Sequence, residues 1–303
     1  MALIDNWLES LDAEIIINKS CVREASPFST CNICIENCPE NALEIKNRKV
    51  NINSHCNSCG DCIPSCPVNA IEGIVEKRKV IGDTLLFLDN TKISAKELLY
   101  YYHKGIRKIG IIDKDLTPSW KSALEDVNKV LVEMDRFKIE ITKDIKHPEP
   151  EEQALSRREL FSFFKKESIS FITKLTPATW RFNHKNYSLE KMYPEWQFYS
   201  IEINKNKCNL CQACFKLCPT KVFDVGNGLI TINDIHCVDC KLCEDVCKEK
   251  AINVTNKIKR TESNVNTVFQ KTCSKCEKHF LSWKDEDDIC FICDSTQEQS
   301  FFK

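Results

Sequence analysis

Four runs of cysteine constrain this chain more than any other feature of its sequence. Sixteen of the 20 cysteines in 303 residues belong to these runs, and three of the runs have the spacing C-x2-C-x2-C-x3-C. The runs comprise Cys21, Cys31, Cys34 and Cys38; Cys56, Cys59, Cys62 and Cys66; Cys208, Cys211, Cys214 and Cys218; and Cys237, Cys240, Cys243 and Cys247. Gaps of two residues let one tight loop place three soft thiolates around a metal centre. The chain is therefore expected to fold around metal.

The cysteine pattern also repeats along the chain. The segment 31–38 matches 211–218 at an offset of 180 residues, and 56–66 matches 237–247 at an offset of 181. Short apolar stretches flanked by turn residues predict strands at 42–46, 49–53, 221–225 and 229–232. The sequence therefore contains two copies of one module, near 20–75 and 201–255. Modules of this size bury little apolar surface, so the bound metal is expected to organise them.

The runs resemble those of bacterial-type two-[4Fe–4S] ferredoxins, and proline follows the last cysteine in three of them, as Pro39, Pro67 and Pro219. In that family the fourth cysteine of each run binds the other cluster of the pair. The resemblance therefore implies four ligand sets: Cys21, Cys31, Cys34 with Cys66; Cys56, Cys59, Cys62 with Cys38; Cys208, Cys211, Cys214 with Cys247; and Cys237, Cys240, Cys243 with Cys218. Zinc ligation and purely structural thiols fit these runs less well, because zinc sites rarely need three ligands plus one.

Two departures from the family pattern stand out. Nine residues separate Cys21 from Cys31, where the family has two. A longer loop can still deliver Cys21, since closing a few extra residues costs little; otherwise the first cluster has three irons or is labile. Lys248 replaces proline after Cys247, which alters the loop and removes no ligand.

Composition narrows the class of protein further. The formal net charge is −1, which offers no bulk attraction to nucleic acid or anionic lipid. No apolar run approaches the roughly 18 residues expected of a membrane span. Residues 1–18 carry four acidic groups and no early positive charge, unlike a secretory signal. Cysteines at metal-binding spacing, without an export signal, indicate a reducing, cytoplasmic compartment.

The cysteine-free segment 80–146 is predicted to alternate strand and helix. Strands are expected at 80–88, 108–113 and 138–145, and helices at 94–104 and 118–134. This order predicts a small Rossmann-like α/β layer with parallel strands. A spacer or docking domain is the preferred interpretation, because the G-x-G-x-x-G turn of dinucleotide sites is absent. Nucleotide or flavin binding remains the alternative.

The segment 147–195 is expected to be a linker with one amphipathic helix. Ser156 to Phe161 resembles a twin-arginine signal but lies in the middle of the chain and precedes charged residues. Apolar side chains at helical spacing favour an amphipathic helix instead. These side chains are Leu160, Phe161, Phe164, Phe171, Ile172 and Leu175.

The remaining four cysteines predict a separate metal site in residues 265–303. Cys273, Cys276, Cys290 and Cys293 have the spacing C-x2-C-x13-C-x2-C, which suits tetrahedral zinc in a ribbon-like knuckle. A single rubredoxin-type iron is the alternative. Zinc is preferred because Glu277 and Asp294 stand where rubredoxin knuckles have glycine. The acidic loop 285–288 would repel phosphate, which argues against nucleic acid as a partner.

His55 and His236 each precede the first cysteine of a second run. They could donate a hydrogen bond to a cluster sulfur and tune its potential. The alternative is a solvated turn residue.

The sequence as a whole predicts an α+β protein with five segments. These are a dicluster module at 1–79, the α/β domain at 80–146, the linker at 147–195, a second module at 196–258 and the knuckle at 265–303. The resemblance implies an electron-transfer protein with four [4Fe–4S] clusters and no catalytic residues of its own. The knuckle adds one expected Zn²⁺. The protein's expected partners are redox proteins, such as the catalytic subunits of molybdopterin oxidoreductases or hydrogenases. A cluster-based redox sensor or assembly factor is a further alternative.

Overall fold

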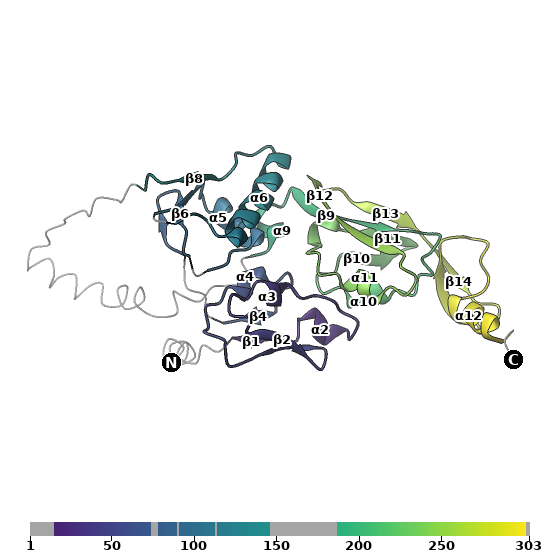
Figure 1. The fold of residues 1–303 in the computed structure, drawn as a ribbon. Helices are drawn as coiled ribbons and strands as arrows, with labels where there is room; N and C mark the ends of the chain where they lie inside the picture. Colours follow the sequence, from purple (N-terminus) through teal and green to yellow (C-terminus); the bar gives the residue numbers. More distant parts are fainter. Residues whose placement is uncertain (1–14, 74–77, 90, 113, 146–186, 301–303) are drawn as a thin grey trace, which may run out of the picture. The chain divides into compact units, whose positions relative to one another are not determined.

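The computed structural model describes residues 15–73, 78–89, 91–112, 114–145 and 187–300 (Figure 1). The chain forms two compact units. The first contains Met1–Cys21 and Asn32–Met192, and the second contains Val22–Cys31 and Tyr193–Lys303. The predicted linker helix and the twin-arginine-like motif lie outside the described residues. Among the helices that the structure describes, none combines the length and apolarity needed to cross a membrane.

The first module occupies residues 15–21 and 32–73 of the first unit. Its elements are β1 (Ile16–Ile17), α3 (Ile33–Glu36), β2 (Leu43–Lys46), β3 (Lys49–Ile52), α4 (Cys62–Ser65) and β4 (Ile71–Glu72). β1 pairs with β4 and β2 with β3, both antiparallel. Asn47 and Arg48, between β2 and β3, both have positive φ, as a tight hairpin turn requires. Cys38, Cys62 and Cys66 are buried in one cluster with apolar neighbours, so the cysteines form part of the core.

The second module occupies residues 193–267 and follows the same plan with longer strands. Its elements are β9 (Trp196–Ile203), α10 (Ala213–Leu217), β10 (Phe223–Gly226), β11 (Leu229–Ile232), η3 (Asp234–His236), α11 (Leu242–Val246), β12 (Ile252–Arg260) and β13 (Asn264–Thr267). β9 pairs with β12, while β10, β11 and β13 form a second antiparallel sheet. The strands predicted at 42–46, 49–53, 221–225 and 229–232 are confirmed to within two residues at either end.

The extra residues between Cys21 and Cys31 pack within the second unit. They include the short helix α2 (Val22–Ala25). The backbone N–H and hydroxyl of Thr30 donate to the carboxylate of Asp245 in α11, over 2.7 and 2.9 Å. The nine-residue segment between the two cysteines is thus structured and makes contacts of its own, whereas its length suggested only a longer loop.

The central domain comprises residues 78–145 with 187–192. Its elements are β5 (Val80–Ile81), β6 (Thr84–Leu86), α5 (Ala95–His103), β7 (Lys108–Gly110), α6 (Pro118–Glu133), β8 (Glu140–Thr142) and α9 (Leu189–Met192). β6, β7 and β8 are parallel neighbours, and the crossover helices α5 and α6 lie side by side (Figure 1). The single strand predicted at 80–88 is wrong, because the chain turns at Gly82, where φ is +58°, and β5 runs antiparallel to β6. The start of the helix predicted at 94–104 is confirmed, because Ser94 is its N-cap and accepts a hydrogen bond from the Glu97 N–H.

A buried ionic cluster holds the central domain against the first module. Arg78 donates to Glu97 of α5 over 2.9 Å and to Asp61, next to Cys62, over 3.3 Å. The three side chains are at most 4% exposed. Asp61 also accepts the backbone N–H of Lys92 over 2.8 Å. The guanidinium therefore compensates two buried carboxylates, one from each side of this contact.

Replacing Arg78 by Met should weaken this contact strongly. Removing one partner of a buried ion pair leaves uncompensated charge and costs about 3–5 kcal/mol. Hydrogen exchange of the α5 amides should report that loss as lowered protection. The matched control is Lys108→Met, which breaks the exposed pair with Asp83 and should cost less than about 1 kcal/mol. Equal protection in the two variants would show that the cluster does not stabilise the contact.

Candidate metal centres

The three regular cysteine runs share one loop conformation. In each run the residues two and four positions after the first cysteine have positive φ. These pairs are Ser58 and Gly60, Leu210 and Gln212, and Asp239 and Lys241. A left-handed residue costs energy unless it is glycine, so five such residues in matching positions indicate a loop whose curvature is imposed by its cysteines. The three regular runs therefore share one backbone geometry.

The first run departs from this conformation. Aligned on Cys31, the two left-handed positions would fall at Thr30 and Asn32, yet Asn32 has φ of −134°. Cys31 belongs to the second unit, where its charge raises the pKa of Cys240, whereas Cys21 and Cys34 belong to the first unit. The irregular spacing noted in the sequence therefore corresponds to a real difference in backbone geometry.

The fourth cysteine of every run sits in a second repeated turn. The residue three positions later is left-handed in all four runs, and the N–H one position further donates to the cysteine sulfur. The donors are Ala42 to Cys38, Ala70 to Cys66 and Ala251 to Cys247, each over 3.2 Å, and Val222 to Cys218 over 3.5 Å. The left-handed residues are Asn41, Asn69, Lys221 and Lys250. Such N–H···S bonds stabilise a negatively charged sulfur, and Lys248 in place of proline does not disturb the turn.

In each module, a side-chain contact brings one cysteine loop beside the fourth cysteine of the other run. Asn57, in the loop after Cys56, donates to Glu40, two residues after Cys38, over 3.3 Å. Asn209 holds the same position after Cys208, in the first run of the second module, and donates to Glu249, two residues after Cys247, also over 3.3 Å. One hollow in the first module is lined by Cys38 together with Cys56, Cys59 and Cys62. The same crossed neighbourhood therefore occurs in both modules.

The sulfurs are close enough to affect one another's ionisation. Burial, together with the nearby Cys208 and Cys247, raises the pKa of Cys214 to about 12. Burial likewise raises the pKa of Cys237 to about 12 and that of Cys240 to about 11, with Cys218 contributing to both. Thiolates crowded in this way need cationic compensation, and iron in a sulfur-ligated cluster supplies it. The donor set and its crossed arrangement fit [4Fe–4S] clusters.

Two lysines at the edge of the central domain reach the first module's fourth cysteines, and sequence reasoning missed both. Lys92 donates to the carbonyl oxygens of Cys38 over 3.2 Å and Glu36 over 2.8 Å. Lys96 donates to the carbonyl of Cys66 and the side chain of Asn69, both over 2.8 Å. Burial lowers the pKa of Lys96 to about 8, while the negative Cys66 sulfur opposes that effect. No sequence motif marks these lysines, because their contacts depend on how the central domain packs.

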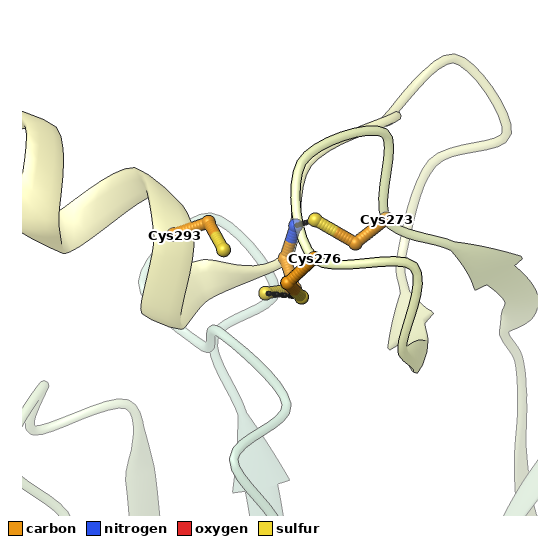
Figure 2. A group of neighbouring side chains, drawn as sticks. Cys273, Cys276 and Cys293 are labelled. Atoms are coloured by element: carbon orange, nitrogen blue, oxygen red, sulfur yellow. Dashed lines mark hydrogen bonds between the residues drawn. The ribbon is translucent and has the colours of Figure 1, made fainter.

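The last four cysteines converge on one point, as predicted. Cys273 and Cys276 lie in the turn between β14 (Phe269–Thr272) and β15 (His279–Ser282), while Cys290 precedes α12 (Phe291–Ser300) and Cys293 lies in its first turn (Figure 2). All four sulfurs lie within 4.8 Å of one another, and Cys276 and Cys290 are separated by 3.8 Å. Tetrahedral coordination with metal–sulfur bonds of about 2.3 Å requires sulfurs about 3.8 Å apart. The geometry therefore fits a single ion.

Backbone donors prepare this site for thiolates. The N–H of Cys290 donates to the Cys273 sulfur over 3.3 Å and, with neighbouring amides, lowers the pKa of Cys273 to about 6. Glu277 has φ of +58°, so the turn takes the left-handed conformation although it lacks glycine. The missing glycine therefore does not distinguish zinc from iron.

Beyond β15, Trp283 donates its indole N–H to the carbonyl of Cys208 over 3.0 Å. No sequence motif predicts this contact.

The role suggested for the two histidines, a hydrogen bond to a cluster sulfur, stays a prediction. His55 is exposed, and its backbone N–H donates to Asn53. His236 is partly buried at the end of η3, next to Cys237.

Two segments of the chain match models of known protein families. Residues 200–248 match the model of a 4Fe–4S dicluster domain, and residues 50–72 match that of a 4Fe–4S binding domain. The chain therefore carries tandem 4Fe–4S domains of the ferredoxin type. The matched residues include the three regular runs and leave the first run outside. A search of curated proteins found no match.

Loss of one knuckle cysteine should remove one metal ion and leave the clusters intact. We expect Cys276→Ser to lower the metal content by about one ion per chain, since tetrahedral sites need four ligands. Elemental analysis of the purified protein measures this, and unchanged iron–sulfur absorbance shows that the modules are loaded. The matched control Ser274→Ala keeps the backbone N–H that bonds to Asp288. Full retention of the ion in the Cys276 variant would contradict a four-thiolate site.

Proposed function

We propose that this protein transfers single electrons through four [4Fe–4S] clusters, two in each module. The observation that carries the proposal is the crossed contact repeated in both modules, Asn57 with Glu40 and Asn209 with Glu249. The proposed ligand sets are Cys21, Cys31, Cys34, Cys66; Cys56, Cys59, Cys62, Cys38; Cys208, Cys211, Cys214, Cys247; and Cys237, Cys240, Cys243, Cys218. The last three sets are supported by the sulfur neighbourhoods that the pKa shifts of Cys59, Cys214 and Cys237 reveal.

A bound [4Fe–4S] cluster accepts and releases one electron at a time, and the protein sets its potential through hydrogen bonds, charge and burial. The chain's own residues provide these controls. N–H groups such as those of Ala42 and Ala251 donate to cysteine sulfurs and stabilise the more negative, reduced state. Apolar side chains such as Ile63 and Ile230, both 0% exposed, exclude water from the cysteines. No proton or covalent step is needed from the protein.

For the knuckle we propose one Zn²⁺ held by Cys273, Cys276, Cys290 and Cys293. The sulfur spacing and the lowered pKa of Cys273 support a thiolate site for one ion. A closed four-cysteine site has no open position for a substrate, which supports a structural role.

The proposed partners are redox proteins that donate and accept single electrons, with catalytic subunits of the molybdopterin oxidoreductase or hydrogenase type as candidates by resemblance. We propose no nucleic-acid partner, because the knuckle's loop at 285–288 is acidic. A reducing compartment such as the cytoplasm suits cysteines that are spaced for metal binding.

Anaerobic purification followed by elemental analysis tests the cluster number. We expect about 16 irons and about 16 sulfides per chain, with [4Fe–4S] signals in the electron paramagnetic resonance (EPR) spectrum after reduction. Iron far below this number without cluster signals would refute the proposal. A bound yellow chromophore, or cluster reduction by NAD(P)H in the pure protein, would support the alternative of a flavin or nucleotide enzyme.

Ligand variants test the individual sets. Cys243→Ser should remove or destabilise one cluster and lower iron by up to about four per chain. Cys21→Ser should do the same if Cys21 completes the first cluster, and a three-iron EPR signal in the wild type would show that it does not. Glu202→Gln, an exposed change on β9, is the matched control and should leave the iron content unchanged.

A further inference from the structure

The central domain places two lysines, Lys92 and Lys96, at the first module. Each ammonium contacts one fourth cysteine through the carbonyl oxygen, Lys92 at Cys38 and Lys96 at Cys66. In the crosswise arrangement these two cysteines serve different clusters. The central domain therefore places one cation beside each cluster of the first module.

The contacts of these lysines indicate a nearby anion. Among the described residues, the hydrogen-bond acceptors of both ammonium groups are neutral oxygens, from Glu36, Cys38, Cys66 and Asn69. The carboxylate of Asp61 also lies near Lys92, but it is already paired with Arg78. Lys96 is mostly buried, and a buried ammonium without a negative counterpart is costly. A cluster with four thiolates carries net negative charge, which becomes more negative on reduction. That charge would compensate the lysines, and the lysines would favour the reduced cluster.

The second module presents the opposite charge to its cysteines. Asp239 lies in the loop between Cys237 and Cys240, and Glu244 directly follows Cys243 in α11. Lys241 pairs with both carboxylates, over 2.8 and 3.5 Å, so one cation faces two anions. In the first module, Asp61 near Cys59 is already paired with Arg78. The surplus charge is positive beside the first module and negative beside the fourth ligand set.

We propose that Lys92 and Lys96 raise the reduction potentials of both first-module clusters above those of the second module, so that electrons enter at the second module and leave from the first. This inference rests on the proposed function. One electron moves from a reduced cluster of the second module to an oxidised cluster of the first, and no bond forms or breaks. The donor is a low-potential one-electron redox protein, and the acceptor is one of higher potential.

The test is an EPR-monitored redox titration of the full-length, cluster-loaded protein under anaerobic conditions. Lys92→Met and Lys96→Met should each lower the potential of one cluster, and the double variant should lower two. Lys96→Arg keeps the charge and should restore a potential near that of the wild type. Lys121→Met, an exposed change on α6, is the control and should shift none. Cys243→Ser identifies which signals belong to the second module.

When the wild-type protein is reduced with one electron equivalent, that electron should reside in the first module. Unchanged potentials in the double variant at full iron content would overturn the proposal, as would a second module with the higher potentials. If the Lys96→Met variant does not bind its clusters, the potentials of the Lys92→Met variant test the proposal, because Lys92 contacts a ligand of the other cluster. A wild-type protein without about 16 irons would instead refute the cluster proposal itself, which separates the two failures.

Discussion

Crowding of cysteine sulfurs is the constraint on which the rest of the structure depends. Several thiols in each module are partly or fully buried, and burial together with neighbouring sulfurs raises the pKa of those such as Cys214 and Cys243. Such an arrangement is costly as free thiolates and favourable around iron. The left-handed residues in the loops, the N–H···S turns and the small apolar cores are all arranged around these sulfurs.

The two modules share this plan and differ in what surrounds it. The first is packed against an α/β domain through the buried Arg78 cluster and receives Lys92 and Lys96. The second is flanked by carboxylates and by the knuckle, whose Trp283 reaches the carbonyl of Cys208. Similar cysteine loops are thus placed in different electrostatic surroundings, which is how one type of cluster can serve at different potentials.

Local patterns were predictable because they depend on residues close in sequence. Both hairpins, at 43–52 and 223–232, follow from short apolar runs around a turn, and Ser94 caps its helix as expected. The strand predicted at 80–88 failed because Gly82 and Asp83 turn the chain between two short apolar stretches, which the prediction joined into one strand. The insertion after Cys21 was recognised as unusual, but its contact with Asp245 joins residues 215 positions apart and leaves no local signal.

The sequence by itself determined the type of cofactor, the duplication of the module and the separate four-cysteine site, because ligand chemistry and spacing are local properties of the chain. Only the tertiary structure decided which charges stand beside which cysteines. Asn57 and Asn209 meet glutamates across each module, and Lys96 meets Cys66, through packing that brings distant segments together. Electrostatic energy depends on distance in space and on burial, and neither can be read from spacing along a chain.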